Sequence, residues 1–482
     1  MQKANRWYDP IITNIYFFAL STRSSIMTPL LLPLLVQTFV GEGRKGTYYG
    51  LLRLVSLMVA LAVQAIAGIY SDHSTSRFGK RRPYIFISTL LEIVGLIILG
   101  LAAATLSGIS GYWALFAIVV ISMITSNFGH AALQGLIPDN VSPEKYAFYS
   151  ATKSFFEVPL PIFFVFLFMR SHIESQNYWS ALVILMSVYI ICGLLTMFVR
   201  EKPQKTSTPV DKTAISRVLT MTVSFTLIIL LVGETTRRVM PLILQSGSSL
   251  DLALVVVLGL AGMLIAVFLG VISSIRISLG SQAKNQRNFT WWVISRLSFL
   301  VGVTNLSSFL LYFIQERFPE AQGVAAVSPV MILMITLGVS LLLGTLVSAR
   351  LMSAVGMKRM LILSGLAAVA GTSLVIIALN VGVMVAGATV CGIATGWFYA
   401  TSWALGTSIV PKGEAGRYLG LSNLAGAGAG AIGAYIGGPI GDSAGFFCQM
   451  VIYGLMFLFS VIAISRINFT PMAQNSAEVS VD

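Results

Sequence analysis

The sequence predicts an all-α protein that crosses a membrane many times, and three observations carry this prediction. Hydrophobic residues make up 56% of the 482 residues, charged residues only 10%, and the mean hydropathy is +0.85. A soluble protein of this length could not bury so much apolar surface. Apolar runs of about 20 residues or more recur along the chain, and a helix of that length spans the hydrocarbon layer. Most Lys and Arg residues lie in the short gaps between these runs.

Fourteen runs follow one another along the chain. The first six lie near 11–39, 47–70, 84–107, 112–136, 146–169 and 178–199. Two more follow the basic stretch 200–217, near 218–245 and 251–275. The last six lie near 289–315, 327–349, 359–379, 381–409, 417–440 and 446–465. Because Glu234, Arg237 and Arg238 interrupt the run at 218–245, it either spans the membrane with these charges at its outer end or lies on the surface.

The distribution of Lys and Arg predicts the orientation. Cytoplasmic gaps of membrane proteins are rich in these residues. If the N-terminus is cytoplasmic, the gaps rich in Lys and Arg lie on the cytoplasmic side. The outer gaps 107–111 and 441–445 contain no Lys or Arg, and the outer gaps 41–46 and 315–320 are exceptions that contain charges of both signs. We therefore expect both termini in the cytoplasm and a location in the plasma (inner) membrane. The net charge of +13 indicates topology rather than nucleic-acid binding.

A faint repeat predicts two halves. Gly79 in "SRFGKRR" has a counterpart 277 positions later, Gly356 in "SAVGMKR", and Pro143 has one 268 positions later, Pro411. Because this offset is longer than six helices need, we expect two inserted helices between the halves. The predicted division is an N-terminal six-helix bundle (1–200), a linker with an extra hairpin (201–288), a C-terminal six-helix bundle (289–466) and a cytoplasmic tail (467–482).

The loop between the second and third runs resembles the signature loop of the major facilitator superfamily. The residues that carry the resemblance are Gly68, Asp72, Arg77, Gly79, Lys80, Arg81 and Arg82. The longer form found here, closed by "RRPY", is similar to the sucrose-transporter-like and glycoside–pentoside–hexuronide symporter groups, as are the segments 136–144 and 410–423. The resemblance covers about residues 10–466. The second-half loop departs from the pattern, with Ser353 where an acidic residue is expected.

The resemblance implies a gate at the inner side. Asp72 and the basic cluster would form a latch when the central cavity faces outward and release it when the cavity faces inward. The implied gate residues are Asp72, Arg77, Gly79, Lys80, Arg81, Arg82 and Arg417. The simpler alternative for the basic residues is a topological anchor.

Ionisable residues inside spans indicate pathways or proton relays, because they are costly in lipid. The proton-coupling candidates are Glu157, Glu92, Lys153 and Arg23. Glu157 and Lys153 share a helix face, and their alternative role is an ion pair that joins helices. Glu92 is expected as a lone carboxylate, with a neutral structural role as the alternative. Arg23 requires a polar cavity or an acidic partner, whereas Arg296, about 10 Å into its span, is expected to reach the inner interface as an anchor.

Neutral polar side chains recur at helical spacing in three spans. The substrate-binding candidates among them are Asn127, His130, Gln134, Asn305, Tyr312, Tyr399 and Trp403. Amides and hydroxyls suit the OH groups of a sugar, and an aromatic ring suits its apolar face. Hydrogen bonding between helices is the alternative.

Two features are expected to be structural. Gly426, Gly430, Ala434 and Gly438 recur every four residues, which lets helices approach closely. Prolines at 29, 33, 159 and 161 are expected to kink the first and fifth spans.

The function expected is secondary active transport by alternating access, with proton-coupled symport of a small polar solute such as a sugar or glycoside. The alternatives are an exporter of amphipathic compounds and a non-transporting membrane assembly factor. The sequence contains no phosphate-binding loop, no metal-spaced His or Cys set and no nucleophile elbow, so neither enzyme activity nor a cofactor is expected. The expected partners are the solute, protons and the lipid bilayer, with no nucleic acid, and a monomer is favoured.

Overall fold

The structure is a computed structural model that describes residues 6–201, 211–245, 248, 250–280, 286–410 and 415–467, except the side chains of 143, 147 and 415–424. Within these residues the chain is almost entirely helical and contains no β-strand. Thirteen helical segments of the described part are long and apolar enough to cross a membrane. The expected all-α, polytopic fold is therefore confirmed, and the chain is an integral membrane protein.

The first six spans fill residues 9–196. They are α1 (Asp9–Ile26) with the π-helical turn η1 (Met27–Leu31) and α2 (Leu32–Val40); η2 (Glu42–Arg44) with α3 (Lys45–Asp72); α4 (Arg82–Thr105); α5 (Gly108–Gln134) with α6 (Leu136–Asn140); η3 (Pro143–Lys145), α7 (Tyr146–Glu157), α8 (Pro159–Phe164), η4 (Val165–Met169) and α9 (Arg170–Glu174); and α10 (Tyr178–Thr196).

The remaining helices are a hairpin and the six segments expected for the second half, and all of them except α17 are among the thirteen. They are α11 (Lys212–Leu244) and α12 (Asp251–Leu279); α13 (Arg287–Arg317); η6 (Gly323–Ala326) with α14 (Val327–Val355); α15 (Met357–Ile377); α16 (Val381–Ile409); α17 (Ala415–Ala444); and α18 (Phe446–Ser465). The run at 218–245 forms one continuous helix, α11, long enough to span the membrane.

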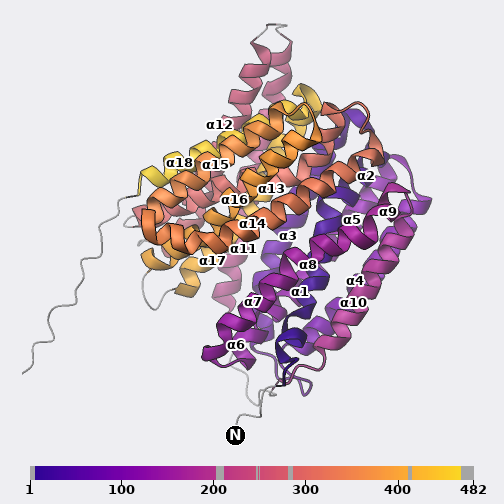
Figure 1. Ribbon diagram of the computed structural model, residues 1–482, viewed down its shortest axis with the longest axis vertical. Helices are drawn as coiled ribbons and strands as arrows, with labels where there is room; N and C mark the ends of the chain where they lie inside the picture. The colour runs from indigo at the N-terminus through magenta and orange to yellow at the C-terminus, as the bar shows by residue number, and fades with distance from the viewer. Residues whose placement is uncertain are drawn as a thin grey trace, which may run out of the picture.

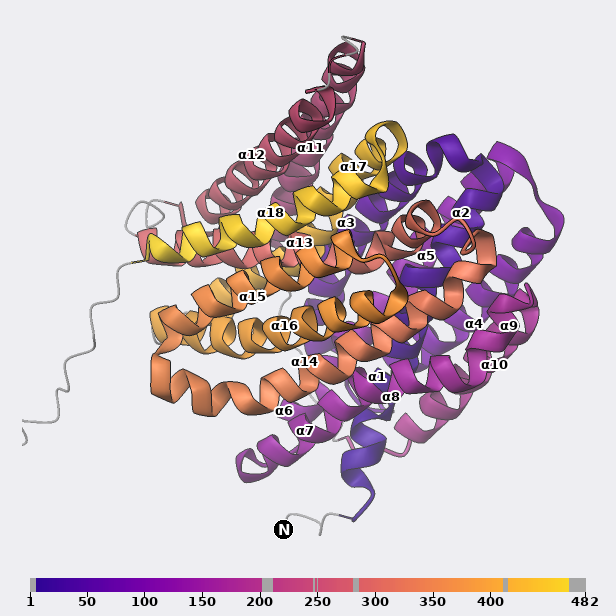
Figure 2. The ribbon, with the colours of Figure 1, turned by 45° about the horizontal axis from the view of Figure 1, so that its top comes forward.

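The helices α1–α10 and α13–α18 form two groups whose axes are inclined to each other (Figures 1 and 2). We call the end of the bundle that carries the loop 71–82 and Arg350 the basic end, and the opposite end the far end. The hairpin α11–α12 packs along α17 and projects beyond the bundle in both views. In this packing Gly270 and Gly428 both face the ring of Phe225.

The first and fifth spans deviate from regular α-helix near their prolines, as expected. Pro29 lies in the π-helical turn η1, and Pro159 begins α8 directly after the break at Val158. Proline lacks the N–H that a regular helix requires and its ring clashes with the preceding turn. These turns shape the helices that line the junction between the two groups.

One contact between the two groups is a seam of small residues on α3 and α17, and it confirms the close approach expected at Gly430, Ala434 and Gly438. A Cβ at Gly438 would lie 2.2 Å from the carbonyl oxygen of Gly46, and one at Gly50 would lie 2.3 Å from that of Ala434. Leu57 packs on Gly430 one turn further along. Gly426 in the next turn of α17 has no neighbour within 4 Å of such a Cβ, so it is not part of the seam.

Gly438→Ala should therefore lower the melting temperature of the purified protein in detergent. The added methyl group meets backbone rather than a movable side chain, and overpacking of this kind costs about 1–3 kcal/mol. Gly426→Ala on the same helix is the matched control, and it should leave the melting temperature unchanged or raise it. Equal melting temperatures for the two variants would show that the seam is not tightly packed.

Candidate functional site

The far end is closed by polar contacts between the two groups. The carboxylate of Asp442, in α17, accepts hydrogen bonds from the backbone N–H of Gly46 and of Thr47, both at 2.7 Å. It therefore caps the N-terminus of α3, where a helix favours negative charge. The Lys45 ammonium donates to Gln315 Oε1 at 3.0 Å and lies 4.8 Å from the centre of the Tyr312 ring.

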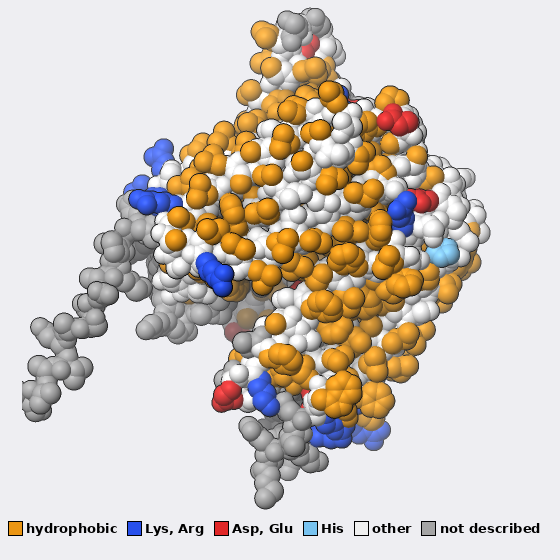
Figure 3. All heavy atoms as spheres, in the orientation of Figure 1, with side chains coloured by type: hydrophobic (Ala, Val, Ile, Leu, Met, Phe, Trp, Pro, Cys, Tyr) orange, Lys and Arg blue, Asp and Glu red, His pale blue; other side chains and the backbone are white. Residues whose placement is uncertain are grey.

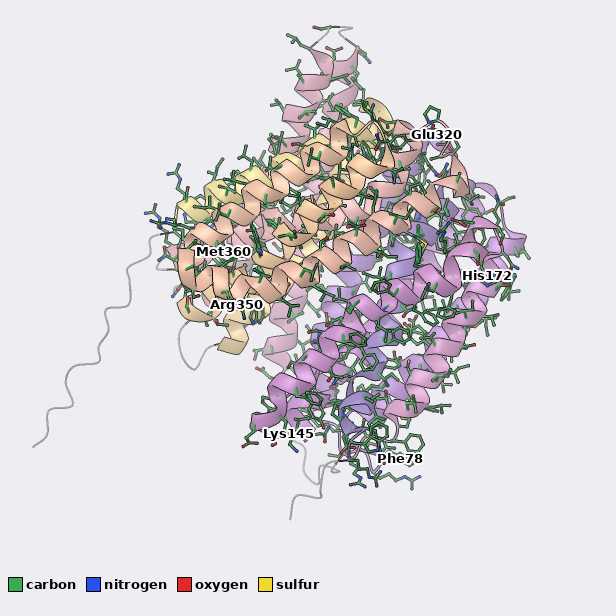
Figure 4. All side chains as sticks on the ribbon, viewed as in Figure 1. Phe78, Lys145, His172, Glu320, Arg350 and Met360 are labelled. Atoms are coloured by element: carbon green, nitrogen blue, oxygen red, sulfur yellow. The ribbon has the colours of Figure 1, made fainter. Side chains whose placement is uncertain are left out.

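The basic end is open. Lys145 and Arg350, which mark the basic ends of the two groups, lie apart (Figure 4). Toward the far end, α9, which carries His172, contacts η6 and α14 of the other group. The space-filling view shows a recess between the two groups on the side of the basic end (Figure 3). Where the groups converge, a small pocket is lined by Ser25, Pro29, Leu30, Ile162, Val165, Met331 and Met334. We call the hollow between the groups the recess.

Several predicted site residues of the N-terminal group form one polar cluster. The ring of His130 on α5 is hydrogen-bonded to Gln64 at 3.4 Å and to Gln134 at 3.2 Å. Lys153 on α7 lies 4.6 Å from the centre of the Phe17 ring, whose edge meets His130. Glu157 forms an ion pair with Lys153, with 3.7 Å between Oε2 and Nζ, and both side chains are about one-third exposed. The cluster joins α1, α3, α5 and α7.

Tyr399 and Trp403 of the C-terminal group lie on α16 beside Arg296 of α13. The Arg296 guanidinium donates to Ser402 Oγ at 3.3 Å and lies 5.5 Å from the centre of the Trp403 ring. This corrects the expectation that Arg296 reaches the membrane interface as an anchor. Arg296 instead joins two helices, because its guanidinium donates a hydrogen bond to Ser402 and makes a cation–π contact with the Trp403 ring.

The structure places three other substrate candidates elsewhere. Asn305 is fully buried and donates to the carbonyls of Val301 and Ala429, so it joins α13 to α17. Tyr312 is also buried, and its hydroxyl donates to the Pro33 carbonyl at 2.8 Å in the far-end closure. Asn127 donates to the Met123 carbonyl of its own helix. Asn305 and Tyr312 thus make the hydrogen bonds between helices that were the alternative role for them.

Glu92 is not the lone carboxylate expected from the sequence. Its side chain is fully buried and forms an ion pair with Arg23 at 3.1 Å. The carboxylate also accepts hydrogen bonds from Ser122 and Thr125, and Arg23 Nη2 donates to Ser122 Oγ at 2.5 Å. Glu92 is thus the acidic partner that was expected for Arg23, whose charge lies inside a membrane-spanning helix. The network joins α1, α4 and α5 and holds the N-terminal group together.

Glu92→Gln should destabilise the protein by about 3–5 kcal/mol, because it leaves the buried Arg23 charge uncompensated. The double variant Arg23→Met with Glu92→Leu should be less destabilised than Glu92→Gln alone. Thermal unfolding in detergent measures both. A Glu92→Gln protein that melts like the wild type but has lost proton coupling would instead assign Glu92 to proton transfer.

The signature loop is organised around Arg81, whose side chain is 5% exposed. Its guanidinium forms ion pairs with Asp72 and, through Nε at 2.8 Å, with Asp139 after α5, and it also donates to Ser71. The Arg81 N–H donates to Glu201 Oε2 at 2.7 Å. Burial raises the pKa of Glu201, an effect that this hydrogen bond opposes.

Gly79 and Gly356, the two glycines of the predicted repeat, share one backbone feature. Both have positive φ angles, 109° and 85°, that favour glycine. A Cβ at Gly79 would also lie 2.4 Å from Glu201 Oε2.

The residues of the expected latch pair within one group. The ion pairs of Asp72, Lys80, Arg81 and Asp139 all lie within the N-terminal group and are formed although the basic end is open. In this conformation they join segments of the N-terminal group to one another rather than one group to the other. Arg77 is exposed and lies over the Phe78 ring, and Arg82 begins α4 beside Glu201. The side chain of Arg417 lies outside the described residues.

Arg81→Gln should lower the melting temperature more than Asp72→Asn. Loss of the nearly buried guanidinium removes charged hydrogen bonds to two carboxylates, at about 1.5–3 kcal/mol each. The half-exposed Asp72 contributes less than about 1 kcal/mol. Arg77→Gln is the matched control and should melt like the wild type. If Asp72→Asn proved the more damaging change, Arg81 would not be the centre of the loop.

Sequence reasoning missed Gln64, Asp139, Glu201 and Asp442. Asp139 and Asp442 both sit in short polar stretches at span ends, which was the available signal. Nothing in the sequence indicated which helix each one faces.

Comparison with known proteins gives local sequence matches and a match over the whole fold. No family model matches the chain. It is 30% identical over 97 residues to the "Proton-associated sugar transporter A" of Homo sapiens, which is 19% of this chain and 12% of that protein. It is 30% identical over 86 residues to a "Sucrose transport protein" of Arabidopsis thaliana, 18% of this chain and 13% of that protein. The chain thus matches only about an eighth of the length of these curated relatives.

The solved structures match the whole chain at low identity. A nucleoside transporter aligns with a TM-score of 0.63 and 14% identity over 95% of this chain and 98% of its own. A peptide transporter aligns with a TM-score of 0.64 and 13% identity over 97% of each chain. A D-xylose-proton symporter aligns with a TM-score of 0.61 and 14% identity over 95% and 97%. All of these are transporters, and the chain shares their fold.

Proposed function

We propose that this protein is a secondary active transporter that works by alternating access. The observation that carries the proposal is the asymmetry of the seam: the two groups are in backbone contact at the far end and separate toward the basic end. A recess between two helix groups, reachable from one end only, is the arrangement that alternating access requires. The proposed domains are the two bundles, 1–200 and 289–466, with the hairpin region 201–288 between them.

The distribution of charge supports an orientation. The basic loops lie at the open end, and the positive-inside rule assigns that end to the cytoplasm. The described conformation is then inward-open, in a cell membrane, with both termini cytoplasmic.

The polar cluster supports a small polar solute, with protons as the coupling ion. His130, Gln134, Tyr399 and Trp403 supply the hydrogen-bonding and aromatic groups that suit a sugar or glycoside. Glu157 is the better proton carrier of the two carboxylates considered, because it is partly exposed, whereas Glu92 is buried and fixed by Arg23. Protonation of Glu157 would release Lys153 for other partners.

The small pocket at the junction favours a second candidate function. Its lining is almost wholly apolar and includes Met331 and Met334. Such a surface suits an amphipathic compound, which the protein would export.

Glu157→Gln should abolish accumulation of sugar driven by a pH gradient and should preserve exchange across proteoliposomes. Radiolabelled sucrose, glucose and xylose are the probes. Glu174→Gln is the matched control, because Glu174 forms the same (i, i+4) pair with Arg170 on the same span, at 2.8 Å. Loss of both activities would give Glu157 a binding or structural role, and export of a fluorescent amphipathic dye without any sugar exchange would favour the second candidate.

A further inference from the structure

Two arginines inside the bundles have no acidic partner. The buried Arg23 has the carboxylate of Glu92 as its counterion. Arg53 and Arg296 each lie at least eight residues from either end of their helices, and neither forms an ion pair with an Asp or Glu of the described residues. A buried cation without a counterion is costly inside a membrane protein.

The two arginines differ in how far their charge is compensated. Arg296 is partly exposed, donates to Ser402 Oγ and makes a cation–π contact with the Trp403 ring. Arg53 is only 7% exposed, and its Nη1 donates a long hydrogen bond, 3.3 Å, to the neutral hydroxyl of Thr28. The Nε atom of Arg53 is buried without a partner among the described residues. Arg53 therefore carries the less compensated charge.

Arg53 lies in the contact between the two groups. It is about 12 Å along α3 from the far end, at 1.5 Å per residue. Thr28 belongs to η1 of its own group, whereas Gly430 on α17 belongs to the other, and a Cβ at Gly430 would lie 3.6 Å from Arg53 Nη2. Leu57, one turn further along α3, packs on the same glycine. The seam between α3 and α17 therefore helps to bury Arg53 while the far end is closed.

We propose that the charge of Arg53 destabilises the closed far end, because the seam keeps its guanidinium from water and separation of α3 from α17 hydrates it. This inference rests on the proposed alternating access. Asp442, Lys45 and Tyr312 hold the far end closed through hydrogen bonds between the groups, and the buried charge opposes them.

The opposition has a use in a transport cycle. A protein that alternates between two states needs both of them to be populated, so neither state can be much more stable than the other. Burial of an ion without a partner costs free energy that hydration restores. Arg53 thus limits the stability of the closed seam and leaves the state that is open at the far end accessible.

The test measures how often the far end opens in the purified full-length protein. Ser308 on α13 is 1% exposed and lies one turn from Tyr312, on the helix face that meets the other group. In a Ser308→Cys protein, the rate of alkylation by a polar maleimide therefore reports the population that is open at the far end. The three native cysteines are all buried, and the protein without Ser308→Cys gives their background rate.

Arg53→Met, which keeps the side-chain length and removes the charge, should lower the alkylation rate about tenfold, because an ion no longer has to be buried. Its melting temperature should equal or exceed that of the wild type. Thr28→Val should raise the rate, because it removes the acceptor that Arg53 uses in the closed state. Arg53→Lys keeps the charge and should stay closer to the wild type than Arg53→Met. Arg350→Met, at an exposed arginine on α14 (Figure 4), is the matched control and should leave the rate unchanged.

The inference requires opposite shifts in Arg53→Met and Thr28→Val, and any other pattern overturns it. An unchanged rate in Arg53→Met would show that the charge is already compensated when the seam is closed. A higher rate, or a lower melting temperature, would show that the side chain stabilises the seam. Failure of the transport proposal is a separate result, because Ser308→Cys would then stay unreactive in otherwise wild-type protein at every pH and solute tested.

Discussion

The structure depends on the close approach of α3 and α17 at the far end. Two helices can bring their backbones together only where side chains are absent, and Gly46, Gly50 and Gly438 supply that surface. Asp442 then reaches the free N–H groups at the start of α3 from the other bundle. Because these backbone contacts lie toward the far end, the bundles can be joined there and separated at the other end.

The remaining charged residues have two different roles, which depend on whether they are buried or partly exposed. The buried pair of Arg23 and Glu92 and the cluster around Arg81 both lie within the N-terminal bundle, and they make it a rigid unit. The partly exposed pair of Glu157 and Lys153 faces the space between the bundles in our proposal. Rigid units with titratable groups between them suit alternating access, in which one bundle rocks against the other around a central site.

Much of the fold follows from the sequence, because length and hydropathy determine which segments can cross lipid. The glycines of α17, the prolines near 29 and 159 and the paired glycines 79 and 356 were informative since each imposes a backbone constraint that depends little on distant residues. The side-chain partners were less predictable. Helical spacing places Asn305 and Tyr312 on a polar face, but it does not say whether that face meets a neighbouring helix or a recess. Likewise, nothing in the sequence linked Arg23 to a carboxylate on α4.

The most direct test of alternating access is a pair of distance distributions from spin labels. One pair of labels at positions 145 and 350 reports on the basic end, and another at 172 and 320 reports on the far end, against a background of three native cysteines that are all buried. The account predicts two populations in each pair, with the short distance at one end accompanying the long distance at the other when pH and solute are varied. Distances that stay single at both ends, or that lengthen together, would contradict it.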